Sequence, residues 1–171
     1  VLMQPLPYQD PASLVHIAAD MRTRNVDDFP HAPPDFADIR AQATMFDGVA
    51  GLVTGRNVFV NDNGDAELVR NGAATPNLFR VLGTRIVEGR DFTDAEGLPP
   101  AQPAQVPGAQ QARPQHPPPP QPAIISYEFW QRRFGGDRAV LDTVVQFAQG
   151  PGPRFQIVGV LEPGFELLYP P

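Results

Sequence analysis

Apolar residues in the first part of the chain fall in short runs separated by turn-forming residues. The run Leu14–Ala18 follows the pair Asp10-Pro11 and predicts a short strand. Pro33 then opens a segment with apolar residues at helical spacing, which predicts a helix. Its packing face is expected to hold Phe36, Ile39, Ala43 and Phe46.

The next segment combines strand-like runs with a strong turn. Residues 61–65 (Asn-Asp-Asn-Gly-Asp) predict a tight hairpin turn between two strands. A short helix is expected over Asn77–Leu82, with Thr75-Pro76 as its cap and Gly83 as its end. The expected strands are Gly51–Thr54, Asn57–Val60 and Glu67–Ala73.

The last third repeats this alternation of strands and helices. Ala123–Ile125 predicts a buried strand, and Ser126 is a good N-cap for a helix over Tyr127–Phe134 that ends at Gly135. A hairpin is then expected from strands Val144–Ala148 and Phe155–Val160 around the turn Gly150–Pro153. Short strands that alternate with short helices indicate an α+β fold with mixed strands.

Between these two ordered blocks lies a proline-rich segment, residues 97–122. It contains ten prolines, and Val106 is its sole β-branched residue. Such a composition buries too little apolar surface to offset the entropy of ordering, which predicts a disordered insertion. A surface-loop insertion and a PxxP ligand for SH3-like domains are the two interpretations of this segment.

Composition narrows the classes of function. The 171 residues carry 19 acidic and 13 basic side chains, for a net charge of -6 and a pI near 4.9. This sign of charge argues against a nucleic-acid partner. A hydrophobic content of 42% suffices for one core of ordinary size. No run of apolar residues in the sequence reaches the length of a membrane-spanning helix.

Cofactor chemistry is limited by the residues that the chain lacks. All basic residues are arginines, which excludes a P-loop lysine and a Schiff-base lysine, and the absence of cysteine excludes thiol catalysis and Cys-type metal sites. His16, His31 and His116 lack the spacing of paired metal ligands. The acidic turn 61–65 has its glycine at the wrong position for a calcium loop. No cofactor or metal is therefore expected.

The hydroxyl and carboxylate candidates for catalysis have structural explanations. Ser126 lacks the Gly-x-Ser-x-Gly elbow of serine hydrolases. The adjacent Asp27 and Asp28 point in different directions, and Asp35 and Asp38 lie where a helix dipole stabilises anions. We therefore expect a non-catalytic protein, with a carboxylate hydrolase as the enzymatic alternative.

The densest cluster of aromatic and basic residues lies at Tyr127–Phe134. On a helix, Tyr127, Trp130 and Phe134 share one face, whereas Arg132 and Arg133 lie off it. Two interpretations follow for this helix. One is core packing with a solvated basic edge, and the other is a partner-binding surface made by Tyr127, Trp130, Arg132 and Arg133.

A series of short sequence motifs, in order along the chain, resembles the periplasmic core domain of MacB-type ABC transporter permeases. The resemblance is closest to permeases whose ATPase is a separate chain, and it covers nearly everything except the proline-rich segment. The motifs are Leu2–Tyr8, Pro34–Arg40 with Phe46, Thr75–Gly83, Glu88–Phe92, Ile125–Asp137 and Ile157–Phe165.

The resemblance implies a bilobed domain. Residues 1–54 would form the first half of a porter-like βαβ subdomain, and residues 55–171 a second, smaller α+β subdomain interrupted by the insertion. A transmembrane helix would end just before Val1, and the second porter half would follow Pro171. Asp142 stands where the family usually has glycine, which leaves the turn geometry there open.

The resemblance also implies a mechanical function without catalytic residues. The domain would lie on the periplasmic side of the inner membrane and would couple ATP-driven movement of membrane helices to substrate export or to a periplasmic partner. Its partners would be its own transmembrane helices, a cytoplasmic ATPase subunit and a periplasmic adaptor or lipoprotein, in a transporter that is a dimer. A stand-alone extracytoplasmic binding or scaffold domain is the alternative function.

Overall fold

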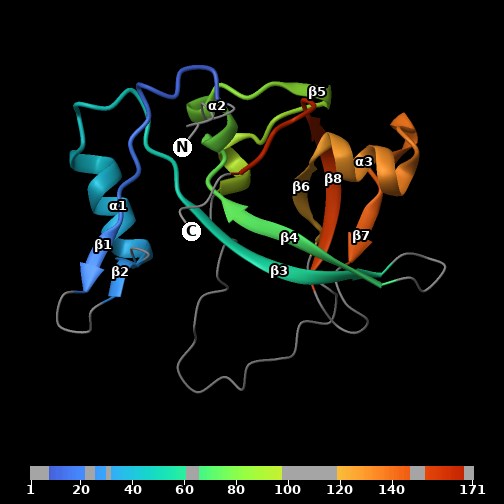
Figure 1. Ribbon diagram of the computed structural model, residues 1–171, viewed down its shortest axis with the longest axis horizontal. Coiled ribbons are helices and arrows are strands. Elements are labelled where there is room, and N and C mark those ends of the chain that lie inside the picture. The colour runs from blue at the N-terminus through green and yellow to red at the C-terminus, as the bar shows by residue number, and fades with distance from the viewer. Residues whose placement is uncertain are drawn as a thin grey trace, which may run out of the picture.

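A computed structural model describes residues 8–21, 26–29, 32–60, 66–97, 119–146 and 153–167, with side chains omitted for residues 19–31. The fold is α+β, as predicted from the sequence (Figure 1). A four-stranded mixed sheet and a long two-stranded hairpin form most of it, and β1 (Ala19–Met21) and β2 (Val26–Phe29) form a separate small two-stranded pair. Within the described residues, no helix has the length and apolar content needed to cross a membrane.

Strand β8 (Arg154–Leu161) is the centre of the mixed sheet. Strand β6 (Gln121–Ile125) runs parallel to it along one edge. Strands β5 (Ile86–Gly89) and β7 (Val144–Gln146) share the other edge, where β7 pairs with the first half of β8 and β5 with the second. The second half of β8, from Ile157 to Leu161, is buried throughout.

The core lies on both sides of this strand. One cluster joins Trp130, on helix α3 (Tyr127–Phe134), to Ile157 and Val160. The other joins Leu161 to Leu78 and Phe79 on helix α2 (Leu78–Leu82). Ile157 and Val160 are fully buried, so β8 holds the two clusters together. Short 3-10 turns at Asp94–Gly97 and Arg138–Val140 complete the connections around the sheet.

Local signals at the helix ends agree with the sequence. The Phe129 N–H donates to Ser126 Oγ at 3.2 Å, which caps α3, and Gly135 ends the helix in the left-handed conformation. Gly83 ends α2 in the same way. Helix α1 (Pro33–Gln42) begins at the predicted prolines but ends before Ala43 and Phe46, so only Phe36 and Ile39 of the predicted packing face lie on the helix; all four side chains are half-buried.

The predicted side-chain cap of α2 was wrong in detail. Asn77 is the N-cap residue, without a capping side-chain hydrogen bond. Thr75 Oγ1 instead accepts a hydrogen bond from the Gly51 N–H at 3.0 Å and donates to Asn77 Oδ1 at 2.8 Å. The hydroxyl is therefore used to join the start of α2 to the start of β3.

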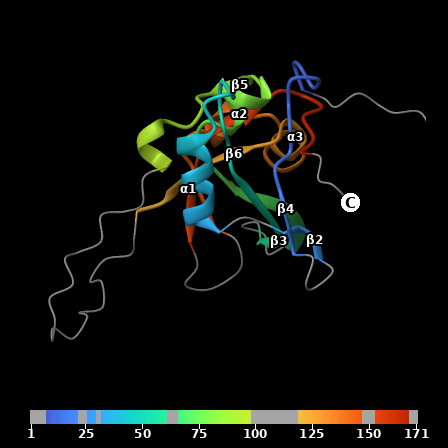
Figure 2. The same ribbon diagram turned by 90° about the vertical axis from the view of Figure 1, so that its left-hand side faces the viewer.

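The predicted strand Leu14–Ala18 was also wrong. This run is irregular, and the first strands are β1 (Ala19–Met21) and β2 (Val26–Phe29), which pair antiparallel. Val15 and Ile17 are 63% and 42% exposed, and no described strand pairs with the backbone of this run. Figure 2 shows β2 and α1 from the end of the molecule at which they lie.

The hairpin of strands β3 (Leu52–Val60) and β4 (Ala66–Ala74) was predicted, but its first strand was predicted as two separate strands, Gly51–Thr54 and Asn57–Val60. Strand β3 runs without interruption because Gly55 and Arg56 keep their register with Asn71 and Arg70. Its turn, residues 61–65, lies outside the described residues. The division into subdomains at residue 54 stays a prediction.

The predicted disordered insertion, residues 97–122, extends slightly too far at its C-terminal end. Gln121 and Pro122 belong to β6, where proline is tolerated because the strand lies at the edge of the sheet. Residues 98–118 lie outside the described residues, as do 147–152, where the turn between β7 and β8 was predicted. Asp142 has a φ of 65°, so it takes the left-handed conformation that glycine would favour.

Candidate functional site

The predicted aromatic cluster on α3 is part of the core. The rings of Tyr127 and Trp130 meet edge to face with centroids 5.5 Å apart. Trp130 is 6% exposed and packs against Val140 and Ile157. Its indole Nε1–H donates to the Asp137 carbonyl at 2.8 Å, which satisfies its polar atom. The aromatic face therefore anchors α3 to the sheet.

The two arginines of the cluster reach across to the hairpin. Arg132 and Arg133 both donate to Glu67 on β4, at 2.7 and 2.5 Å. The guanidinium of Arg133 also lies 5.9 Å from the ring centroid of Phe59, and that ring meets Phe129 edge to face at 5.3 Å. These contacts tie the outer half of the hairpin to α3. A partner-binding role for this face stays a prediction.

Glu67 is held in its charged form by this arrangement. Burial by itself would raise the pKa of the carboxyl group, but the hydrogen bonds and charges of Arg133 and Arg132 outweigh it and lower the pKa. A carboxylate between two guanidinium groups is a strong structural tie. It lacks the proton-exchanging character of a general acid or base.

Other residues considered for catalysis from the sequence do not come together. Ser126 has the capping role described above, and Asp35 and Asp38 are exposed on α1. His31 and His116 lie outside the described residues, as do the side chains of Asp27 and Asp28. Among the described residues, no group of three histidine, aspartate or glutamate side chains is placed to hold a metal ion.

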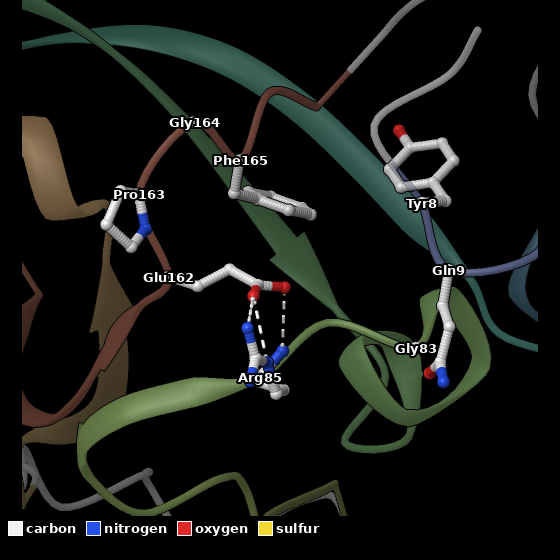
Figure 3. A pocket seen from close by; sticks show the side chains of 8 residues that line it. All are labelled: Tyr8, Gln9, Gly83, Arg85, Glu162, Pro163, Gly164 and Phe165. Atoms are coloured by element: carbon white, nitrogen blue, oxygen red, sulfur yellow. Dashed lines mark hydrogen bonds and ion pairs between the residues drawn. The ribbon is translucent and has the colours of Figure 1, made fainter.

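A pocket of about 520 Å³ forms where the first and last described segments of the chain meet (Figure 3). We call this region the clasp. Four sequence segments supply its walls: the start of the described chain, the end of α2, the start of β5 and the residues after β8. Its lining residues are Tyr8, Gln9, Gly83, Arg85, Glu162, Pro163, Gly164 and Phe165.

Aromatic and backbone contacts hold the first described segment in the clasp. The Tyr8 and Phe165 rings lie 6.2 Å apart between centroids, and the Tyr8 hydroxyl donates to the Glu166 carbonyl at 3.4 Å. The Gln9 N–H donates to the Leu82 carbonyl at 3.5 Å. A Cβ at Gly83 would lie 2.6 Å from the Cβ of Gln9, so this close approach requires glycine.

An ion pair forms the other wall of the clasp. Glu162 accepts hydrogen bonds from the backbone N–H and from Nε of Arg85, at 3.1 and 3.0 Å. The Glu162 N–H in turn donates to the Arg85 carbonyl at 3.0 Å. Three hydrogen bonds therefore fix the chain leaving β8 against the chain entering β5, as the dashed lines of Figure 3 partly show.

The clasp connects directly to the core. Phe165 meets the buried ring of Phe79 edge to face at 5.8 Å. Phe79 belongs to the cluster that includes Leu161, at the end of the central strand. Two aromatic contacts therefore connect Tyr8 to the core cluster that contains Leu161 of β8.

Sequence reasoning gave no site role to the clasp residues. Tyr8 and Phe165 each belong to one of the sequence motifs that resemble the family. Their contact could not be predicted, because the two residues lie near opposite ends of the chain. Arg85 and Glu162 lie 77 positions apart, and no sequence motif contains both of them. Glycines at the turn positions Gly83 and Gly164 were the available signal for close chain approach.

The fold and the clasp define a small α+β domain that is tied together where its first and last described segments meet. Residues 4–169 match the family model of the MacB-like periplasmic core domain, so the chain belongs to this family. Such a domain is part of an ABC transporter permease and lies outside the cytoplasm. The family resemblance found in the sequence is thereby confirmed. No curated protein sequence gives a significant match.

Two solved structures share the fold. One is the periplasmic region of MacB from Actinobacillus actinomycetemcomitans, with 13% identity, a TM-score of 0.56 and 84% of this chain covered. The other is the extracellular domain of the noncanonic ABC-type transporter YknZ from Gram-positive bacteria, with 15% identity, a TM-score of 0.57 and 79% covered. The matches span 56% and 59% of those chains.

Proposed function

We propose that this domain is a non-catalytic mechanical module of an ABC transporter permease. In this role it passes movement of the membrane helices to a periplasmic partner or substrate, while an ATPase in the cytoplasm supplies the energy. The observation that carries the proposal is the clasp, in which Tyr8 contacts Phe165 and Phe165 contacts Phe79. Membership of the family supports the setting.

The clasp suits this role because the first and last described segments of the chain meet in it. We propose that the segment before Tyr8 leads toward a membrane helix and that the segment after Phe165 leads into the rest of the porter-like subdomain. Pulling on either segment then acts on the same aromatic contact and on the adjoining Arg85–Glu162 pair. Displacement passes between sites through such packed contacts when the intervening elements are rigid.

The partners follow from the same proposal. The cytoplasmic ATPase is a separate chain, and the assembled transporter is a dimer with an adaptor or a lipoprotein as its periplasmic partner. A stand-alone extracytoplasmic scaffold is the competing function. Hydropathy of the complete gene separates the two, because a scaffold requires no membrane helices on either side of the domain.

The test uses the full transporter with its ATPase subunit, reconstituted in lipid. Replacing Tyr8 and Phe165 together by alanine is expected to leave the basal ATP hydrolysis rate unchanged and to reduce export in the same vesicles. Met45→Ala, at an 84% exposed position away from the clasp, is the matched control. Export at the unmodified rate in the clasp variant would contradict the proposal.

A further inference from the structure

The outer face of the hairpin carries two arginines directly opposite each other. Arg56 on β3 and Arg70 on β4 are cross-strand partners, and the next pair on the same face is Val58 with Leu68. Val58 is 41% exposed and Leu68 is 63% exposed. Residues on the opposite face include Phe59 and Glu67, which contact α3. Arginine and apolar pairs therefore lie together on the solvent side.

This arginine pair differs from most arginines of the described chain. Six described arginines form ion pairs with described carboxylates: Arg80, Arg85, Arg90, Arg132, Arg133 and Arg138. Neither Arg56 nor Arg70 forms an ion pair or a hydrogen bond there, and the hairpin face they share carries no carboxylate among its described residues. Like charges directly opposite each other in an antiparallel pair destabilise it. An anion between the two guanidinium groups would remove this repulsion.

We propose that this face binds an acidic, extended polypeptide segment of a partner protein. A carboxylate of the segment pairs with Arg56 and Arg70, because guanidinium groups match a carboxylate with two hydrogen bonds. An apolar side chain two positions away contacts Val58 and Leu68. Two-residue spacing is the repeat of an extended chain, which fits the arrangement of the two pairs.

The hairpin also offers backbone groups to such a segment. Among the described residues, β3 and β4 pair only with each other, so neither long edge of the ribbon has a strand partner there. Addition of a strand to an open edge is a recurring mode of peptide recognition. An anionic membrane surface is a poorer occupant, since it is recognised by clusters of about four to eight basic residues.

This inference does not rest on the coupling role of the clasp, which involves other residues. The test measures binding of the full chain to a fluorescein-labelled peptide with the sequence Glu-Ser-Val-Ser repeated three times. The reference peptide has glutamine in place of glutamate. Binding is expected for the glutamate peptide, much weaker binding for the glutamine peptide, and a loss of binding at high salt.

Variants locate the site. The double replacement Arg56→Ser and Arg70→Ser is expected to weaken binding at least about tenfold, and Leu68→Ser to weaken it less. Arg40→Ser removes one exposed arginine on α1 and is the net-charge control for the single variants Arg56→Ser and Arg70→Ser, each of which is expected to weaken binding more than Arg40→Ser does. Thermal unfolding at an unchanged or higher temperature is expected for the double variant, because it removes the repulsion.

Three results would overturn the inference. The first is that the glutamate and glutamine peptides bind equally well, or that neither peptide binds. The second is an equal loss in Arg40→Ser and in the two single variants, which would assign the effect to overall charge. The third is binding of the chain to phosphatidylglycerol vesicles that depends on Arg56 and Arg70 while the peptide does not bind, which would assign the face to a lipid surface.

Discussion

Replacing Gly89 by alanine tests the closest backbone approach in the mixed sheet. Gly89 ends β5 with a φ of 76°, and a Cβ there would lie 2.3 Å from the Val158 carbonyl oxygen and 2.8 Å from Leu141 Cδ2. The left-handed conformation costs an L-residue about 1–2 kcal/mol. The contact with backbone forces β5 away from β8, which also strains the hydrogen bond from the Arg90 N–H to Val158, 2.9 Å long.

The expected loss of stability is about 3 kcal/mol or more, from the conformational term, a lost hydrogen bond and reduced packing. This is a large part of the total for a domain of ordinary stability, about 5–15 kcal/mol. Urea unfolding followed by fluorescence measures it. Trp130 is the sole tryptophan of the sequence and lies in the core, so its emission reports unfolding of the sheet.

Gly135→Ala is the control that separates the two causes. Gly135 also has a positive φ, of 62°, but nothing lies within 4 Å of the position of its Cβ. Its replacement therefore carries the conformational cost alone, about 1 kcal/mol. Equal losses for Gly89→Ala and Gly135→Ala would refute the claim that backbone contact across β5 and β8 determines the requirement for glycine.

Three further predictions concern single residues. Asp142→Val is expected to lower the free energy of unfolding by about 2 kcal/mol, because a β-branched residue tolerates a positive φ poorly, whereas Asp142→Asn stays within about 0.5 kcal/mol; urea titration of both checks this. Trp130→Phe is expected to cost about 1–2 kcal/mol, through a smaller ring and loss of the hydrogen bond to Asp137, with a folded circular dichroism spectrum retained. The pKa of Glu96 is lowered from 4.5 to about 2, first by its hydrogen bond from Arg90. The unfolded state therefore binds more protons in this range, so the stabilisation is complete above about pH 4.5 and disappears as the pH falls through about 2. Glu96→Gln should reduce the slope of stability against pH between these values, and an unchanged slope would disprove the assignment.

Elements with local causes were predictable from the sequence. Helix α3 was predicted with its correct bounds because Ser126 caps its first turn and Gly135 takes the conformation that ends it. Helix α1 begins at the prolines, whose fixed φ suits the first turn. The family was recognisable for a related reason: its sequence motifs are short contiguous segments, so they can be read without knowledge of the tertiary structure.

Elements that depend on distant partners were predicted less well. The apolar run Leu14–Ala18 has the composition of a strand, but strand formation requires a neighbouring strand, and none pairs with this run. Strand β3 was predicted as two pieces because Gly55 weakens the local strand signal. Pairing with Asn71 across the hairpin overrides that weakness.

The sequence by itself determined much of the local structure of this protein: most helix ends, the hairpin, three of the four strands of the mixed sheet (β6, β7 and β8, but not β5) and the family. Only the tertiary structure decided which surfaces meet. It placed β8 between β5 and β6, Glu67 between Arg132 and Arg133, and Tyr8 against Phe165. The physical reason is that caps and turns act within a few residues, whereas these contacts form between segments whose proximity is set by packing of the whole chain.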